Sequence, residues 1–232
     1  MTYSFRLVAA ALLLSTAPAF ADPALLSPSQ YTAALMMPAP AADGSAEQQH
    51  ELAEIKAIQA KMSTADFAKA QSDNDNESVS AFAEVFGPWF DLTKLPKTAA
   101  LFAVVRKEED TAGKAVKTYF HRNRPWHLDE TLKTCERGKN VQTSYPSGHA
   151  TMGYSMAVVL SHLLPDQADA IMSRAKSYGE NRLVCGDHYR SDIVAGQVLG
   201  TVVANELLAN PAFQPTFEAA KSELATARSA AH

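Results

Sequence analysis

The segment that organises this chain runs from residue 117 to residue 192 and contains three polar clusters. They read Lys117-Thr-Tyr-Phe-His-Arg-Asn-Arg124-Pro125, Pro146-Ser-Gly-His149 and Arg182-Leu-Val-Cys-Gly-Asp-His-Tyr-Arg-Ser-Asp192. Each cluster adjoins a run of apolar residues with helical spacing, so the polar side chains lie near predicted helix ends. We therefore expect the chemistry of the protein in these clusters and interpret the rest of the chain as scaffold.

The first cluster contains two cations, Lys117 and Arg124, at a spacing close to two helical turns. On one continuous helix they would project from nearly the same face. Pro125 disfavours helical geometry at Arg124, so we expect Arg124 at the frayed end of the helix, reaching beyond it. Two cations in this arrangement suit a phosphate group, and a basic, solvated helix end is the alternative.

The second cluster precedes a strongly apolar helical pattern, so Ser147 is the expected N-cap of a helix. The amides of Gly148 and His149 would then lack acceptors at the positive end of the helix dipole, where an anion is favoured. Gly148 has no side chain and lets a phosphate approach the backbone. The alternative is an ordinary capped helix that carries a surface histidine.

In the third cluster His188 and Asp192 are four residues apart, so they share a helix face. The carboxylate can accept a hydrogen bond from one ring nitrogen and leave the other as a nucleophile. Gly186 is expected to break the chain after Arg182, which lets that arginine point into the same site. A surface polar contact is one alternative, and a metal ion held by His149, His188 and Asp192 is another. We disfavour the metal because three nearby cations repel it, whereas they complement a phosphate dianion.

The remaining pattern predicts an all-α protein, a single-domain helical bundle with the active site at helix ends and no significant sheet. A convincing alternating strand pattern is lacking. Helices are expected over residues 46–70, 78–86, 96–121, 147–164, 166–182, 189–208 and 211–227. The predicted domains are a signal peptide at 1–21, an extended Pro/Ala-rich arm at 22–45 and the helical domain at 46–232.

Two connecting segments lead to separate predictions. Residues 73–77 read Asp-Asn-Asp-Asn-Glu and lack the glycine and distal glutamate of a calcium-binding loop, so a solvated turn with a helix cap is expected. The loop at 125–145 is long for a compact domain, which favours a functional lid.

Composition and the N-terminus indicate the class of protein. Residues 1–21 have the charged start, apolar run and small-residue cleavage site of a secretory signal peptide, with cleavage expected after Ala21. The alternative, a membrane anchor, needs a longer apolar run, and we expect no membrane span. A formal net charge of −4 argues against a nucleic-acid surface. Two cysteines in an exported chain suggest one disulfide, and two buried free thiols are the alternative.

Together the three clusters resemble the tripartite signature of the type 2 phosphatidic acid phosphatase superfamily. Each spacing agrees, and one departure is Asn181, which stands where that signature usually has serine. The chain length, the secretory N-terminus and the two cysteines look most like the bacterial class A non-specific acid phosphatases. Three clusters in the right order are a much stronger signal than any one of them.

The resemblance implies a secreted, periplasmic acid phosphatase that hydrolyses small-molecule phosphomonoesters without a metal or other cofactor. By resemblance His188 is the nucleophile that forms a phosphohistidine, Asp192 orients it, and His149 is the general acid and base. The phosphate is then bound by Lys117, Arg124, Ser147, Gly148, His149 and Arg182.

The resemblance also suggests a homodimer, and transfer of phosphate to alcohols such as nucleosides as a side activity. We further expect a disulfide between Cys135 and Cys185, which would tie the 125–145 loop to the third cluster. Two other functions are kept open: a vanadium-dependent haloperoxidase of the same superfamily, and an exported protein that binds phosphate or phospholipid headgroups without turnover.

Overall fold

The computed structural model describes residues 24–32 and 37–231, and within these ranges it contains helices and no strand. The all-α prediction is therefore confirmed. The predicted signal peptide at 1–21 lies outside the described residues. The bounds of the longer helices are α2 Ala46–Lys61, α3 Thr64–Asp75, α5 Pro96–Phe120, α7 Gly148–Leu163, α8 Ala168–Val184, α9 Arg190–Ala209 and α10 Gln214–Ala230. Short helices are α1 Pro28–Tyr31, η2 Val79–Phe82, α4 Ala83–Phe86, α6 Pro125–Leu128 and η3 Pro165–Gln167.

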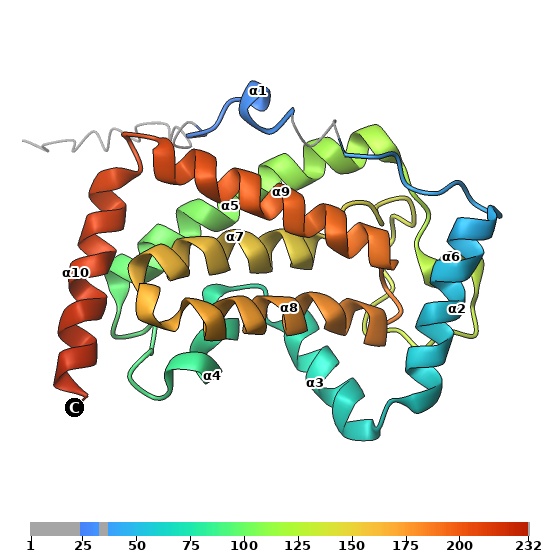
Figure 1. Cartoon of the computed structure of the whole chain (residues 1–232), viewed down its shortest axis with the longest axis horizontal. Coiled ribbons are helices and arrows are strands. Elements are labelled where there is room, and N and C mark those ends of the chain that lie inside the picture. Colours follow the sequence, from blue (N-terminus) through green and yellow to red (C-terminus); the bar gives the residue numbers. More distant parts are fainter. Residues whose placement is uncertain (1–23, 33–36, 232) are drawn as a thin grey trace, which may run out of the picture.

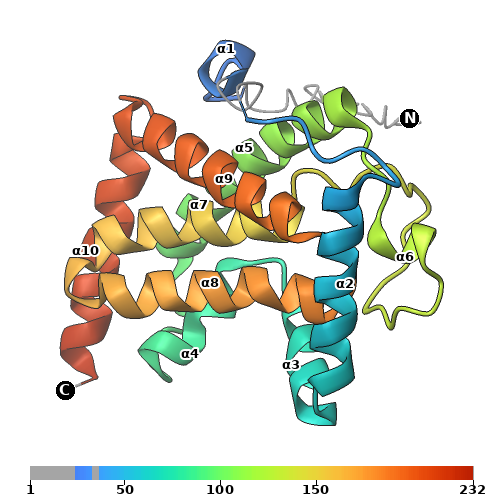
Figure 2. The ribbon, with the colours of Figure 1, turned by 45° about the vertical axis from the view of Figure 1, so that its right-hand side comes forward.

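Helix α7 is the centre of the bundle and packs against α5, α8 and α9 (Figure 1). Turning the molecule shows the same helices side by side, with α10 across one end and α2 across the other (Figure 2). Helices α5 and α8 end where α7 and α9 begin. This alternation of direction brings all three polar clusters to one end of the bundle.

Two glycines let α9 approach α7 closely. A Cβ atom at Gly196 would lie 2.6 Å from the carbonyl oxygen of Ser147, and one at Gly200 would overlap the backbone of Thr151. The contact seats the first turn of α9 against the start of α7, where the Ser147 amide donates to the Asp192 carbonyl at 2.9 Å. In the described part of the chain α9 is the one helix apolar and long enough to cross a membrane, and about half of it is buried within the bundle, where it packs against α7.

The hydrophobic core consists of two clusters. The larger one fills the space between α5, α7, α8 and α9 and extends to the arm through Leu26, Tyr31 and Met37. The smaller one lies under α2, close to the third polar cluster, and includes Ile55 and Leu183, both fully buried. Burying side chains of this size stabilises the fold by about 1.5–3 kcal/mol each. The bundle end with the polar clusters is thus supported by packed apolar residues.

The structure corrects two predicted elements. The helix expected over 46–70 is two helices, because Ser63 and Asp66 form a reciprocal capping box that starts α3. The arm was expected to lack regular helix, yet α1 begins at Pro28, a position where proline is tolerated because the first helical amide needs no partner.

Candidate active site

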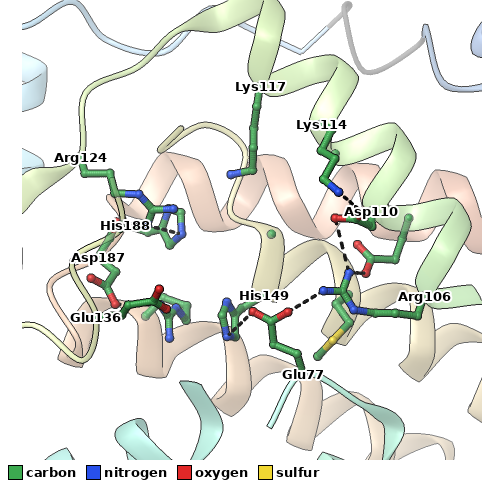
Figure 3. A pocket seen from close by; sticks show the side chains of 16 residues that line it. Glu77, Arg106, Asp110, Lys114, Lys117, Arg124, Glu136, His149, Asp187 and His188 are labelled. Atoms are coloured by element: carbon green, nitrogen blue, oxygen red, sulfur yellow. Dashed lines mark hydrogen bonds and ion pairs between the residues drawn. The ribbon is translucent and has the colours of Figure 1, made fainter. Parts of the chain in front are cut away.

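A cavity of about 220 Å³ opens at the end of the bundle where the polar clusters meet (Figure 3). Six of the predicted residues line it: Lys117, Arg124, Gly148, His149, Arg182 and His188. The other two, Ser147 and Asp192, are fully buried behind its wall. Residues from four helices and two loops therefore converge here, as the cluster spacing predicted.

Lys117 lies in the last turn of α5, and its ammonium group is held by backbone oxygens. Its Nζ donates to the carbonyls of Thr143 and Pro146, each at 2.6 Å. Burial, reinforced by the positive charge of Arg124, lowers the pKa of Lys117 to about 7. An anion that enters the cavity would offset both effects and favour the charged form.

Arg124 reaches the site from outside α5. The helix stops at Phe120 because His121 adopts a left-handed conformation with φ 48°, so the two cations do not share one helix face. The Arg124 amide instead donates to the Val141 carbonyl at 2.9 Å. The Nη1 atom of Arg124 lies 3.1 Å from the Asp187 carbonyl oxygen and 3.2 Å from Nε2 of His188.

The second cluster starts α7 as predicted. Ser147 is the N-cap, and its Oγ accepts from the Ala150 amide at 3.4 Å. Gly148 and His149 are the first two residues of the helix, so their amides have no acceptor within it. A Cβ atom at Gly148 would reach the Lys117 side chain at 4.0 Å, so the missing side chain leaves room between the helix end and the lysine.

His149 points into the cavity and is held from below by α3 (Figure 3). Its Nε2 lies 3.1 Å from the Asn74 carbonyl oxygen and 3.5 Å from Oε1 of Glu77. Because a carbonyl can only accept, Nε2 carries a proton. Burial, and after it the charge of Arg182, holds the pKa of His149 well below its usual value.

His188 precedes α9 and is oriented by the Ser144 carbonyl. Its Nδ1 lies 2.8 Å from that oxygen, whereas the nearest Asp192 oxygen is 3.5 Å away. The predicted direct hydrogen bond to Asp192 is therefore replaced by one to Ser144. Nδ1 donates to the carbonyl, which leaves the lone pair of Nε2 in the cavity. Burial and the charges of Arg124 and Lys117 hold the pKa of His188 well below its usual value, so the ring is neutral.

Asp192 acts on His188 through Ser144. Its carboxylate accepts from Ser144 Oγ at 2.6 Å, from Arg122 Nη1 at 2.6 Å and from the Tyr189 amide at 2.8 Å. Sequence reasoning missed Arg122 and Ser144. Arg122 lies within the first cluster, and this position could have identified it as a candidate site residue. Ser144 precedes the second cluster by two residues and carried no signal of its own.

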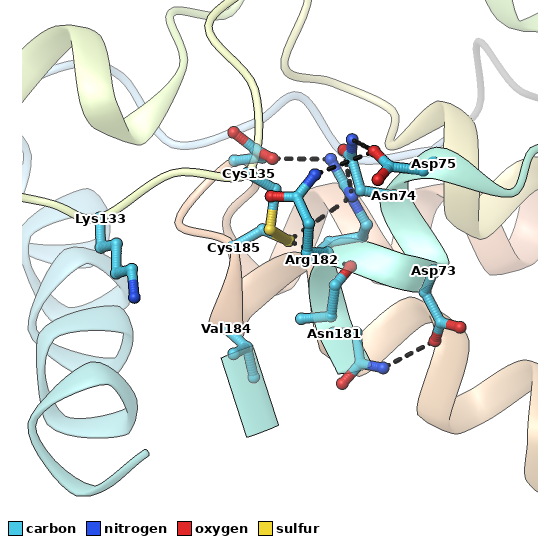
Figure 4. The surroundings of a disulfide bond; sticks show 12 residues. Asp73, Asn74, Asp75, Lys133, Cys135, Asn181, Arg182, Val184 and Cys185 are labelled. Atoms are coloured by element: carbon cyan, nitrogen blue, oxygen red, sulfur yellow. Dashed lines mark hydrogen bonds and ion pairs between the residues drawn. A yellow bond between two sulfur atoms is a disulfide. The ribbon is translucent and has the colours of Figure 1, made fainter. Parts of the chain in front are cut away.

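Arg182 is fixed by α3 and by the loop that follows α8 (Figure 4). Its Nη1 donates to Asn74 Oδ1 at 2.9 Å, and its Nη2 donates to Asp187 Oδ2 at 2.7 Å. Asn181, at the departure from the usual signature, donates to Asp73 Oδ2 at 2.7 Å. Asp73 and Asn74 are buried, so the prediction of a solvated turn at 73–77 is wrong for these two residues, which support Asn181 and Arg182; Asp75 and Glu77 are exposed where α3 ends.

The predicted disulfide between Cys135 and Cys185 is confirmed, with a Cα–Cα distance of 5.0 Å (Figure 4). It joins the 125–145 loop to the residue that follows α8. Gln59 of α2 reinforces the junction by donating to the carbonyls of Lys133 at 2.7 Å and Val184 at 3.0 Å. The loop is thereby fastened beside Arg182.

The opposite side of the cavity carries a second set of charges, mostly from α5 (Figure 3). Arg106 donates to Glu77 at 2.5 Å, pairs with Glu109 and lies 3.8 Å from Asp110. Asp110 also pairs with Lys114 at 2.6 Å. Burial raises the pKa of Glu109 to about 8 against the opposing effect of Arg106. We call these five residues the α5 side of the cavity and the predicted cations with His188 the phosphate side.

Comparison with known proteins agrees with the site. The PAP2 superfamily model matches residues 98–214, a range that contains all three clusters. An acid phosphatase of Zymomonas mobilis is 33% identical over 206 residues, which are 85% of this chain and 77% of that protein. A non-specific acid phosphatase of Providencia stuartii is 32% identical over 149 residues, which are 62% of this chain and 60% of that one.

The solved structures share the fold at lower identity. The transmembrane PAP2-type phosphatidylglycerolphosphate phosphatase of Bacillus subtilis superposes with a TM-score of 0.55 at 18% identity, covering 76% of this chain and 91% of that one. The family match over half of the chain and the long relative from Zymomonas agree with the three clusters and their convergence. The chain belongs to the PAP2 superfamily and is a phosphomonoester hydrolase related to the bacterial non-specific acid phosphatases.

Proposed function

We propose that this protein is a secreted, periplasmic acid phosphatase that works through a phosphohistidine at His188 and needs no metal ion. The observation that carries the proposal is the state of His188. Its Nδ1 donates to the Ser144 carbonyl oxygen at 2.8 Å, so a neutral ring presents the Nε2 lone pair to a cavity lined by Lys117, Arg124 and Arg182. A nucleophile beside three cations suits attack on an anionic phosphate ester.

In the first step Nε2 of His188 attacks phosphorus, and the bond between phosphorus and the ester oxygen breaks. The electron pair of that bond stays on the leaving oxygen. Arg124 donates to Nε2 in the free site at 3.2 Å, and a bound phosphate competes for this donor and frees the lone pair. Lys117, Arg182 and the amides at the start of α7 then stabilise the charge on the equatorial oxygens.

His149 is the proposed general acid. It gives a proton to the leaving oxygen, and in the second step it takes a proton from the water that displaces His188 from phosphorus. Its pKa is depressed by burial and by Arg182 in the free site. A phosphate anion beside Arg182 offsets that charge and favours the protonated ring, so activity is expected to be highest on the acid side.

The metal-free chemistry is supported by the composition of the phosphate side, where Lys117, Arg124 and Arg182 surround His188 and the one adjoining carboxyl, Asp187, is already paired with Arg182. Secretion rests on the sequence of residues 1–21, and the arm at 22–45, the helical domain at 46–232, the homodimer and the lack of nucleic-acid partners stay predictions. We expect the α5 side and the 125–145 loop to select the natural phosphomonoester, because residues of both line the cavity.

The proposal is tested by trapping the intermediate. Wild type, His188→Ala and His149→Ala are mixed with a labelled aryl phosphate after dialysis against a chelator, and acid-labile phosphoenzyme is measured after rapid quench. Wild type and His149→Ala should form it, and His188→Ala should not. His149→Ala should lose about a hundredfold to ten-thousandfold more activity on an alkyl phosphate than on an aryl phosphate, because a good leaving group needs no proton.

Two results would contradict the proposal. Phosphoenzyme in His188→Ala but not in His149→Ala would reverse the assigned roles. Loss of activity after dialysis, restored by zinc or magnesium, would overturn the metal-free mechanism.

A further inference from the structure

Two polar atoms on the phosphate side are buried without a hydrogen-bond partner among the residues that the structure describes. They are Oδ1 of Asp187 and Nε of Arg182. The two side chains are joined by another pair of atoms, Arg182 Nη2 and Asp187 Oδ2, at 2.7 Å. Because unsatisfied buried polar atoms are rare, this acceptor and this donor, in two paired side chains that line the same cavity, point to a ligand that supplies both partners.

Asp187 belongs to the cavity wall and is 1% exposed. It directly precedes His188, and its own carbonyl oxygen accepts from Arg124 at 3.1 Å. The charged groups that act on its carboxyl are Arg182 from α8, Arg124, and Glu136 and Arg137 from the 125–145 loop. Figure 3 shows Asp187 on the same side of the cavity as Arg124 and His188.

An aspartate in this place is unexpected for a site that binds a dianion. A carboxylate repels a phosphate dianion at close range, yet it is a good acceptor for the hydroxyl of a singly protonated phosphate. The second ionisation of a phosphate monoester occurs near pH 6, so the protonated form is abundant on the acid side. A protonated carboxyl group facing a phosphate dianion is equivalent to a carboxylate facing a singly protonated phosphate, because each pair contains one proton and forms one hydrogen bond.

We propose that Asp187 and the substrate phosphate share one proton, so that the enzyme selects the singly protonated phosphate monoester. The shared proton lies between Asp187 Oδ1 and one phosphate oxygen, while Arg182 Nε donates to another. This inference rests on the proposed function, since it assumes that the phosphate binds beside His188. It adds a specificity-determining residue and a second physical cause of acid-side activity.

The ionisation of Asp187 agrees with this geometry. Burial raises the pKa of its carboxyl to about 6, against the lowering effect of Arg182 and Arg124. Above that pH the free enzyme has a carboxylate and the free phosphate is a dianion. Binding must then take up a proton from solution.

The test is calorimetric titration of the full-length enzyme with inorganic phosphate, above the second ionisation of phosphate, in buffers of different ionisation enthalpy. The slope of binding enthalpy against buffer enthalpy gives the protons taken up. Lys117 and His149 can also gain protons when an anion binds, so the decisive quantity is the difference between wild type and Asp187→Asn. The amide donates to a dianion without any proton, so uptake should fall by about one per phosphate bound.

Asp110→Asn is the matched control, because it removes the same charge from the α5 side of the same cavity. It should keep the wild-type uptake, and Asp187→Glu should restore uptake if the longer carboxyl reaches the phosphate. The alkaline limb of kcat/KM should also move to higher pH in Asp187→Asn.

The proposal is overturned if Asp187→Asn binds phosphate with the same uptake as wild type, or if Asp110→Asn reduces it equally. It is also overturned if wild type binds phosphate without taking up a proton, a result that needs no variant to fold. Failure of wild type to bind phosphate at all would instead remove the proposed function, on which this inference rests.

Discussion

The two sides of the cavity contain the same kinds of residue and use them differently. On the α5 side each cation is matched by carboxylates, since Arg106 contacts Glu77 and Glu109, and Lys114 contacts Asp110. On the phosphate side Arg182 pairs with Asp187 at 2.7 Å, but neither Lys117 nor Arg124 has a carboxylate within ion-pair distance in the described part of the chain. They donate instead to carbonyls and to His188.

The difference decides what each side can do. When a cation is paired with a carboxylate, the two charges largely cancel and a ligand anion is attracted only weakly. A cation held by neutral carbonyls is fixed in position and keeps its full positive charge for the ligand. The buried cations of the phosphate side repel one another and so destabilise the free protein. A bound anion would relieve this repulsion, which favours its binding. The Cys135–Cys185 disulfide fastens the 125–145 loop next to this charged side of the cavity.

Removing that fastening should give the largest change in stability. The disulfide closes a loop of 50 residues, for which the chain-entropy model gives about 4 kcal/mol as an upper figure. Urea unfolding of Cys135→Ser with Cys185→Ser should show that loss relative to oxidised wild type. Activity towards aryl phosphates should fall as well, because Arg124 directly precedes the 125–145 loop and Glu136 lies in it, and both line the cavity. Wild type kept under reductant serves as the control and should behave like the double variant. Full stability without the bond would show that the loop is held by its other contacts.

Replacing one cation on each side tests the comparison directly. Arg124→Ala should lower kcat/KM by about a hundredfold to a thousandfold, the effect typical of losing a donor to the transition state. Arg106→Ala should lower kcat/KM by no more than about fivefold on a small aryl phosphate, because Arg106 is already paired with Glu77 and Glu109 and has little charge left for the phosphate. Arg124→Lys should restore part of the loss, since a point charge replaces a planar fork. Equal losses at Arg106 and Arg124 would mean that both sides contact the phosphate.

The difference between local and long-range contacts explains which features the sequence could predict. The helices and the three clusters were predicted because helical spacing, the N-cap at Ser147 and the cluster spacings are local properties. The break before α3 was also local and was missed, although Ser63 and Asp66 have the spacing of a capping box.

The hydrogen-bond and ion-pair partners of the site residues could not be predicted from local sequence. The carboxylate of Asp192 is held by Arg122, 70 residues away, and the guanidinium of Arg182 by Asn74, 108 residues away. Such pairs depend on how the helices pack, and the acidic run around Asn74 looks solvated until α8 is placed beside it. Glu109 and Asp187 belong to no motif, because their raised pKa values arise mainly from burial and, after it, from neighbouring carboxylates that the fold brings close.

The smallest predicted effect concerns Glu109. On the α5 side charged groups are paired with opposite charges, but the pKa of Glu109 is raised although Arg106 lies beside it. Burial raises the pKa of this carboxyl from 4.5 to about 8 even though Arg106 is beside it. Between those values the folded protein keeps a proton that the unfolded chain has lost, so the free energy of unfolding falls as pH rises through this window. One proton adds a slope of at most about 1.4 kcal/mol per pH unit. Glu109→Gln should remove this slope, so its stability relative to wild type should increase with pH in urea unfolding series.

The matched control is Glu108→Gln, the adjacent buried carboxyl, which accepts from the amides of Leu25 and Leu26 at 2.8 and 3.2 Å. That variant loses contacts with the arm but keeps Glu109, so it should be less stable than wild type while retaining the pH slope. A Glu109→Gln variant with an unchanged slope would mean that Arg106 keeps Glu109 ionised. Every charged group on the α5 side would then be ionised and paired with an opposite charge, which is the opposite of Lys117 and Arg124.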